Sequence, residues 1–197
     1  MSKRMREGRF IALFLGMLIN VLPVTSFAAD KGGSYALEGP GRVSCRAFAE
    51  IDASSDQMKL LAAWTLGYLS AHNRILSDTY DLTPWQNIES VLGLTRQYCL
   101  SNGEATYEES LQELMRFLAP DRLQAAEPIV QIGSGPLQAV VYGSTIKEVR
   151  QILEREGYAL PKNDEALATT LQKFQRNNAL PETGILDQAT LLVLFRD

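Results

Sequence analysis

The stretch TIKEVRQILEREGY at Thr145–Tyr158, followed after five residues by DEALATTLQKFQRNNALPETGILDQATLLVLF at 164–195, decides the fold of the C-terminal part of the chain. Apolar residues recur three and four positions apart in each part, which is typical of amphipathic helices. Gly157, Pro181 and Gly184 interrupt the pattern and mark turns. We therefore expect residues 144–197 to form three short helices around a small common core.

Local signals predict where these helices begin and end. Thr145 and Glu148 have the spacing of a capping box, which predicts the start of the first helix. The second helix can start at 163–164, and Asn177-Asn178 tolerate the left-handed conformation that would end it. Asp187 is expected to cap the third helix.

The order of residues in 144–197 resembles the small peptidoglycan-binding domain that is appended to many bacterial wall hydrolases. The most specific part of this resemblance is Phe174-Gln175, Leu180-Pro181, Thr183-Gly184, and Asp187 with Thr190. The resemblance implies a three-helix module that binds peptidoglycan. A stable helical module that serves protein contacts is the alternative.

One departure from the family concerns the loop between the first two helices. The family usually carries a longer glycine-rich loop with an Asp-Gly pair, whereas this chain has only Ala159–Asn163. If that loop contacts the ligand, binding would be weakened or altered. Amide and aromatic side chains suit sugars and peptide stems, which offer many neutral donors and acceptors. We expect the exposed ligand-binding side chains to be Tyr158, Gln172, Gln175, Asn177, Asn178 and Thr183.

Residues 1–28 have the features of a secretory signal peptide. A basic start is followed by the apolar run Phe10–Val24, and Ser26-Phe27-Ala28 fits a small-x-small cleavage site. An uncleaved anchor is the alternative, but the run is shorter than the roughly 20 residues that a spanning helix needs. We expect cleavage after Ala28, a periplasmic protein and no membrane span in the mature chain.

Cleavage would leave an acidic protein. Residues 29–197 hold 15 Lys and Arg against 22 Asp and Glu, a net charge of −7. Nucleic-acid binding needs a basic face that neutralises phosphates, so we expect no nucleic-acid partner.

Cys45 and Cys99 are the two cysteines of the chain. In an oxidising compartment, two cysteines in one domain most simply form one disulfide. A thiol nucleophile is the alternative; it would need a base, and His72 is the only histidine.

Residues 29–41 are glycine-rich and expected to be flexible, and a helical domain is expected over 42–118. Periodicity predicts helices over 44–51 and 55–76, a third that is capped by Thr83 and reaches Cys99, and a fourth that begins after the capping-box spacing of 101–104. In the second helix, one side is expected to carry Leu60, Leu61, Trp64, Tyr68 and Ile75, and Gly67 to permit a close helix contact.

This domain resembles a superfamily of small periplasmic helical proteins. The residues that carry the resemblance are Cys45, Phe48, Trp64, Gly67, Tyr68, Asn73 and Cys99. The superfamily includes HdeA-type acid-stress chaperones and immunity proteins that neutralise the wall-degrading toxins of rival bacteria. His72 and Asn73 are the candidate partner-binding residues of this domain, although a surface position or a structural hydrogen bond is the favoured role of His72, and a structural hydrogen bond that of Asn73.

Residues 119–143 are rich in proline and glycine and are expected to be a linker, with a short extended piece at 129–132 and with residues 140–142 packing on the last domain. Motifs for hydrolytic, nucleotide-binding or zinc chemistry are missing from the sequence. A carboxylate pair such as Asp78 and Asp81 could in principle cleave glycosides, but the domain is short for a sugar cleft. We expect no enzyme activity, no cofactor and no metal.

Taken together, the sequence predicts an all-α, non-catalytic periplasmic protein. A disulfide-linked four-helix domain would bind a protein partner, and a three-helix module would bind peptidoglycan. The alternatives are an immunity or inhibitor protein against a cell-wall hydrolase and a periplasmic acid-stress chaperone.

Overall fold

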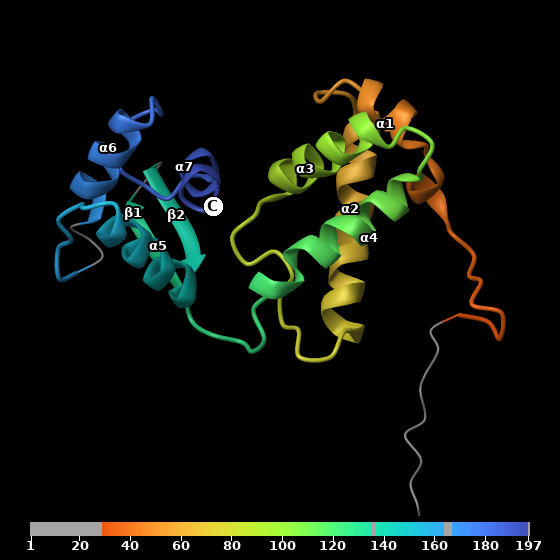
Figure 1. The fold of residues 1–197 in the computed structure, drawn as a ribbon, viewed down its shortest axis with the longest axis horizontal. Coiled ribbons are helices and arrows are strands. Elements are labelled where there is room, and N and C mark those ends of the chain that lie inside the picture. The colour runs from red at the N-terminus through yellow and green to blue at the C-terminus, as the bar shows by residue number, and fades with distance from the viewer. Residues whose placement is uncertain (1–28, 135–136, 164–166, 197) are drawn as a thin grey trace, which may run out of the picture. The chain divides into compact units, whose positions relative to one another are not determined.

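The computed structural model describes residues 29–134, 137–163 and 167–196. Its elements, in chain order, are η1 Gly39–Arg42, α1 Cys45–Glu50, α2 Asp56–Ile75, α3 Ile88–Ser101, α4 Tyr107–Leu118, η2 Ala119–Asp121, β1 Ile129–Ser134, β2 Leu137–Tyr142, α5 Gly143–Arg155, α6 Leu167–Asn177 and α7 Gln188–Leu194 (Figure 1). The described part is mostly helical. None of its helices combines the length and apolar character needed to cross a membrane.

The chain divides into two units, Met1–Ala36 and Leu37–Asp197, and of the first the structure describes residues 29–36. In the first unit, the Asp30 carboxylate accepts hydrogen bonds from the backbone N–H groups of Gly32 and Ser34, each at 2.8 Å. The signal peptide predicted for residues 1–28 lies outside the described residues. The second unit holds two separate hydrophobic cores, one in the helical domain (37–123) and one in the C-terminal module (129–196).

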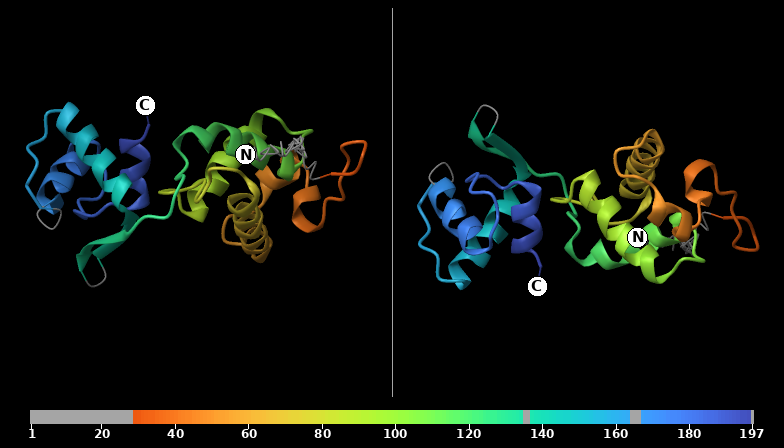
Figure 2. Two further views of the ribbon diagram at one scale, coloured as in Figure 1. Left: turned by 90° about the horizontal axis from the view of Figure 1, so that it is seen from below. Right: turned by 90° about the horizontal axis from the view of Figure 1, so that it is seen from above.

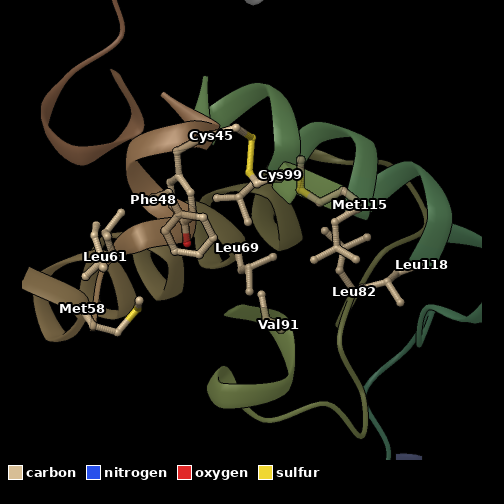
Figure 3. Packing of buried hydrophobic residues seen from close by; sticks show 14 residues of the cluster. Cys45, Phe48, Met58, Leu61, Leu69, Leu82, Val91, Cys99, Met115 and Leu118 are labelled. Atoms are coloured by element: carbon tan, nitrogen blue, oxygen red, sulfur yellow. A yellow bond between two sulfur atoms is a disulfide. The ribbon is translucent and has the colours of Figure 1, made fainter. Parts of the chain in front are cut away.

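The predicted disulfide is present in the helical domain. Cys45, at the start of α1, is bonded to Cys99, near the end of α3, and both cysteines are buried. Figure 3 shows the disulfide beside Phe48, with Leu82, Met115 and Leu118 farther along the same core. The bond therefore fixes the short helix α1 against the core that α3 and α4 share.

Tyr107 lies at the centre of this core and is fully buried. Its ring packs against Phe48, with ring centroids 4.6 Å apart. Its hydroxyl lies 2.6 Å from the Thr65 hydroxyl, which donates its own hydrogen to the Leu61 carbonyl at 2.8 Å. Tyr107 is therefore the donor to Thr65, and burial raises the pKa of the phenol to about 12.

We predict that Tyr107 makes the folded protein sensitive to alkali. Its pKa is about 12 in the folded protein against an ordinary value of 10.0. The unfolded chain therefore releases this proton first, and stability is lost as pH rises from about 10 to about 12. Tyr107→Phe should cost about 1 kcal/mol at neutral pH, because Thr65 loses its donor. The same variant should lose less stability than the wild type between neutral and alkaline pH.

Urea unfolding at neutral and alkaline pH measures both effects. Tyr35→Phe, at an exposed tyrosine, is the control for general phenol ionisation. An alkaline stability loss in the Tyr107→Phe variant as large as that of the wild type would contradict the assignment.

The helix starts of this domain differ in part from the sequence prediction. α1 and α2 lie within the predicted ranges 44–51 and 55–76, and Ser44 and Ser55 are their N-caps. The predicted cap at Thr83 is wrong: Asn87 caps α3, and Trp85 precedes the helix. The fourth helix begins after 104, as predicted, but the capping box expected at 101–104 is wrong: Ser101 still belongs to α3, and Thr106 with Glu109 forms the capping box of α4.

The outer face of α2 also differs from the expectation. Leu60 and Ile75 were expected on the buried side, but they are 60% and 62% exposed. Gly67 is exposed, and a Cβ added there would meet nothing within 4 Å. Its predicted close helix contact is therefore not made within the described chain.

The segment expected as a linker contains a β-hairpin. Strands β1 and β2 pair antiparallel, with Ile129 opposite Tyr142 and Ile132 opposite Ala139. Ile132 and Val141 are buried in the core of the C-terminal module, and β2 leads directly into α5 (Figure 2). The expectation of a purely all-α fold is therefore corrected to a mostly helical fold with one two-stranded sheet. The packing of residues 140–142 on the last module is confirmed at Val141.

The three helices expected in the C-terminal module are present as α5, α6 and α7. The capping box expected at Thr145 and Glu148 is wrong, because α5 already begins at Gly143 and Thr145 is buried. Gly157 has the predicted left-handed conformation, with φ 83°, and Tyr158 N–H bonds to the Leu153 carbonyl, as in a Schellman cap. The predicted start of α6 at 163–164 lies partly outside the described residues.

Two further turns complete the module. The left-handed residue after α6 is Ala179, with φ 55°, and not Asn177 or Asn178 as expected. Asp187 caps α7 as predicted, and its carboxylate accepts the Thr190 N–H at 2.9 Å.

Candidate functional site

A buried glutamine holds the turn between α6 and α7. Gln175 is 0% exposed. Its side-chain amide donates to the Thr183 hydroxyl at 2.9 Å, to the Ile185 carbonyl at 3.0 Å and to the Thr190 hydroxyl at 2.9 Å. Its carbonyl accepts the Gly184 N–H at 2.8 Å. The exposure expected for Gln175 is therefore wrong: a polar side chain at this depth is retained because each of its polar atoms has a partner.

Asp187 extends this network beneath the turn. Its carboxylate accepts hydrogen bonds from the hydroxyls of Thr183, at 2.6 Å, and Thr190, at 2.7 Å. Gly184 has φ 70°, and a Cβ there would lie 3.2 Å from the Ala168 carbonyl oxygen. The residues that carry the resemblance to the peptidoglycan-binding domain thus form buried hydrogen bonds and a tight turn that hold the module in its shape.

An exposed ion pair also links α6 to this turn. The Arg176 guanidinium binds the Glu182 carboxylate through two hydrogen bonds, at 2.9 Å and 2.5 Å. These bonds hold the pKa of Glu182 below its usual range. Both groups are exposed, so the pair positions the turn more than it stabilises the module.

The other predicted ligand-binding residues lie in separate surroundings. Asn177 donates to the Tyr158 hydroxyl at 2.9 Å, so an exposed amide and a half-buried phenol form one pair on the surface. Exposed Asn178 donates to the Phe174 carbonyl at 3.0 Å and closes the end of α6. Exposed Gln172 lies beside Gly184. The structure thus brings Tyr158 together with Asn177 and turns Thr183 inward.

A groove that the sequence reasoning missed lies between α5 and the shortened loop. It has a volume of about 620 Å³ and is lined by Gly143, Ile146, Lys147, Arg150, Gln151, Glu154, Leu160, Pro161 and Lys162. Arg150 donates to the Pro161 carbonyl, and the Thr170 hydroxyl donates to the Ala159 carbonyl at 2.9 Å. The loop is therefore held by α5 on one side and by α6 on the other. The three-residue spacing of Lys147 and Arg150, which puts both on one helix face, was the available sequence signal.

The residues predicted to bind a partner lie at the end of α2. The His72 Nδ1–H donates to the Tyr68 carbonyl at 2.8 Å. It also lines a pocket of about 470 Å³ whose apolar wall includes Leu76, Leu82 and Met115. The side-chain oxygen Oδ1 of Asn73 accepts the Leu82 N–H at 3.0 Å, so this side chain shapes the turn that follows α2.

Within the described residues, no cluster of three or more histidine, cysteine or carboxylate side chains is placed to hold a metal ion. The C-terminal module has two candidate ligand-binding surfaces: the pair of Tyr158 with Asn177, and the groove along α5. Both offer neutral or charged hydrogen-bonding groups to a polar ligand.

One comparison with known proteins identifies a family for this module. Residues 142–194 match the family described as "Putative peptidoglycan binding domain". The match begins at the last residue of β2 and ends with α7. It indicates peptidoglycan binding and a place in the cell envelope, and the matched domain is a binding domain and not a catalytic one. No curated protein and no solved structure matches the chain significantly. The family match does not include residues 42–118, so the resemblance of the helical domain to HdeA-type and immunity proteins gains no support from it.

Proposed function

We propose that this protein is a non-catalytic envelope protein that attaches to peptidoglycan through its C-terminal module. The observation that carries the proposal is the family match over 142–194, on a module whose motif residues form one closed hydrogen-bond network. A rigid module with exposed amides and an aromatic ring suits a polymer of sugars and short peptides, because both offer neutral donors and acceptors. Export through residues 1–28 would place the protein in the periplasm.

Truncation of the chain tests this proposal. We expect residues 29–197 to sediment with purified peptidoglycan sacculi, and a chain that ends at Gln124, before the hairpin, to stay in the supernatant. The shorter chain keeps every residue of the helical-domain core, and its circular dichroism spectrum would confirm that it is folded. If the two chains sediment alike, the C-terminal module is not the wall anchor.

We further propose that the helical domain binds a protein partner. Its α2 helix buries Leu61 and Leu69 but leaves Leu60 and Leu66 exposed, so the helix is apolar on two faces. A helix with this pattern usually packs on both sides, and open Gly67 leaves room for a close approach. If the partner is a cell-wall hydrolase that is bound to the same peptidoglycan, the protein acts as its inhibitor.

A further inference from the structure

The described lining of the groove along α5 is mainly basic, in an acidic chain. Among the lining residues that the structure describes, Lys147, Arg150 and Lys162 are basic and Glu154 is acidic. The whole chain, in contrast, has a net charge of −4. Neither lysine forms an ion pair with any residue that the structure describes. Two ammonium groups are thus available to an acidic ligand in one open groove.

Leu160 and Pro161 give this groove an apolar wall from the shortened loop, and Ile146 contributes from α5. The loop does not stand away from the module, because the Arg150 and Thr170 side chains bond to its carbonyls. A short extended peptide could therefore lie between the loop and α5, with its methyl groups on this wall and its carboxylates at the cations.

We propose that this groove binds the peptide stems of peptidoglycan through their free carboxylates, with Lys147, Arg150 and Lys162 as the binding cations. The inference rests on the proposed peptidoglycan binding, and it states that the groove contacts the stems. In this polymer the sugar strands are neutral and the stems carry the carboxylates, so a basic groove binds the stems in preference to the sugars. Charge-assisted hydrogen bonds are shorter and stronger than neutral ones, so the stems would supply much of the affinity.

The test compares two variants with the same change in charge. Lys147→Gln/Lys162→Gln removes both groove lysines, and Lys59→Gln/Lys173→Gln removes two exposed lysines elsewhere. Each is measured on residues 29–197, with intact sacculi and with sacculi whose stem carboxylates have been converted to neutral amides, which leaves the sugar strands unchanged. We expect the groove variant to bind intact sacculi about tenfold more weakly than the wild type, as the loss of two charge-assisted contacts implies. The control variant should bind like the wild type, and conversion of the stem carboxylates to amides should weaken the wild type at least to the level of the groove variant.

Two results would overturn the inference and leave the proposed function intact: equal binding by the two variants, or wild-type binding that is unchanged when the stem carboxylates are neutral amides. Nuclear magnetic resonance with a free stem tetrapeptide gives an independent readout, since the amide signals of Lys147, Arg150 and Lys162 should shift. If the wild type binds neither sacculi nor the tetrapeptide, the proposed function and the inference both fail.

Discussion

Loss of the Cys45–Cys99 disulfide is expected to destabilise the helical domain by about 4 kcal/mol, because the bond closes a long loop and so restricts the unfolded chain. The two cysteines are 54 residues apart in the sequence, and both are buried. The loss approaches the whole stability of a typical small domain. We therefore expect α1, the shortest α-helix of the domain and the one that carries Cys45, to separate from α3 first.

Hydrogen exchange measured by mass spectrometry, with and without reductant, localises this effect. Peptides from α1 and α3 should lose protection on reduction, whereas peptides from α5 and α6 should not, since residues 129–196 contain no cysteine. A Cys45→Ala/Cys99→Ala variant without reductant is the control and should behave like the reduced protein. Unchanged protection in α1 after confirmed reduction would show that packing alone holds this helix.

The second large effect is expected at Gln175. Gln175→Ala should destabilise the C-terminal module by about 3 kcal/mol, because it leaves the buried Gly184 N–H and Ile185 carbonyl without partners and opens a cavity. Gln175→Glu keeps the size and the acceptor for Gly184, but an ionised carboxylate cannot donate to Thr183 or Thr190. It should therefore also be destabilising.

Gln172→Ala, on the same helix at an exposed position, is the matched control and should change stability by less than about 0.5 kcal/mol. Urea unfolding of residues 29–197, followed by the exchange of α6 and α7 amides, measures all three variants. If Gln175→Ala unfolds like the wild type but no longer binds sacculi, Gln175 contacts the ligand, and the structural role argued above is wrong.

Apolar periodicity predicted the helices well, because burial of one face decides whether a helix forms. α2 was predicted to within one residue at each end, and α7 was predicted with its Asp187 cap. Capping motifs were less reliable. Thr83, Ser101 and Thr145 each precede a Glu or Gln at the right spacing, yet among the helix starts that the structure describes only Thr106 with Glu109 forms the complete box. A cap acts where the packed helix happens to begin, and packing is not visible in four residues.

The hairpin and the site show two other limits. Pro128 and Gly133 contributed to the expectation of a linker, but Gly133 lies in β1 opposite Gln138. The pairing of two strands depends on both, so the residues of one segment do not reveal it. In the site, Gln175 and Thr183 were expected on the surface because they are polar. They are buried or half-buried because Gly184, Asp187 and Thr190 supply their hydrogen-bond partners. Such a network depends on all its members, and a single polar residue in the sequence does not reveal it.

Peptidoglycan binding by the C-terminal module is tested by titrating purified sacculi with residues 29–197 and measuring the bound protein, with and without soluble muropeptides as competitors. We expect saturable binding that muropeptides displace and that the chain ending at Gln124 does not show. Binding that never saturates, or that excess muropeptide leaves unchanged, would contradict the claim and favour a module that serves protein contacts.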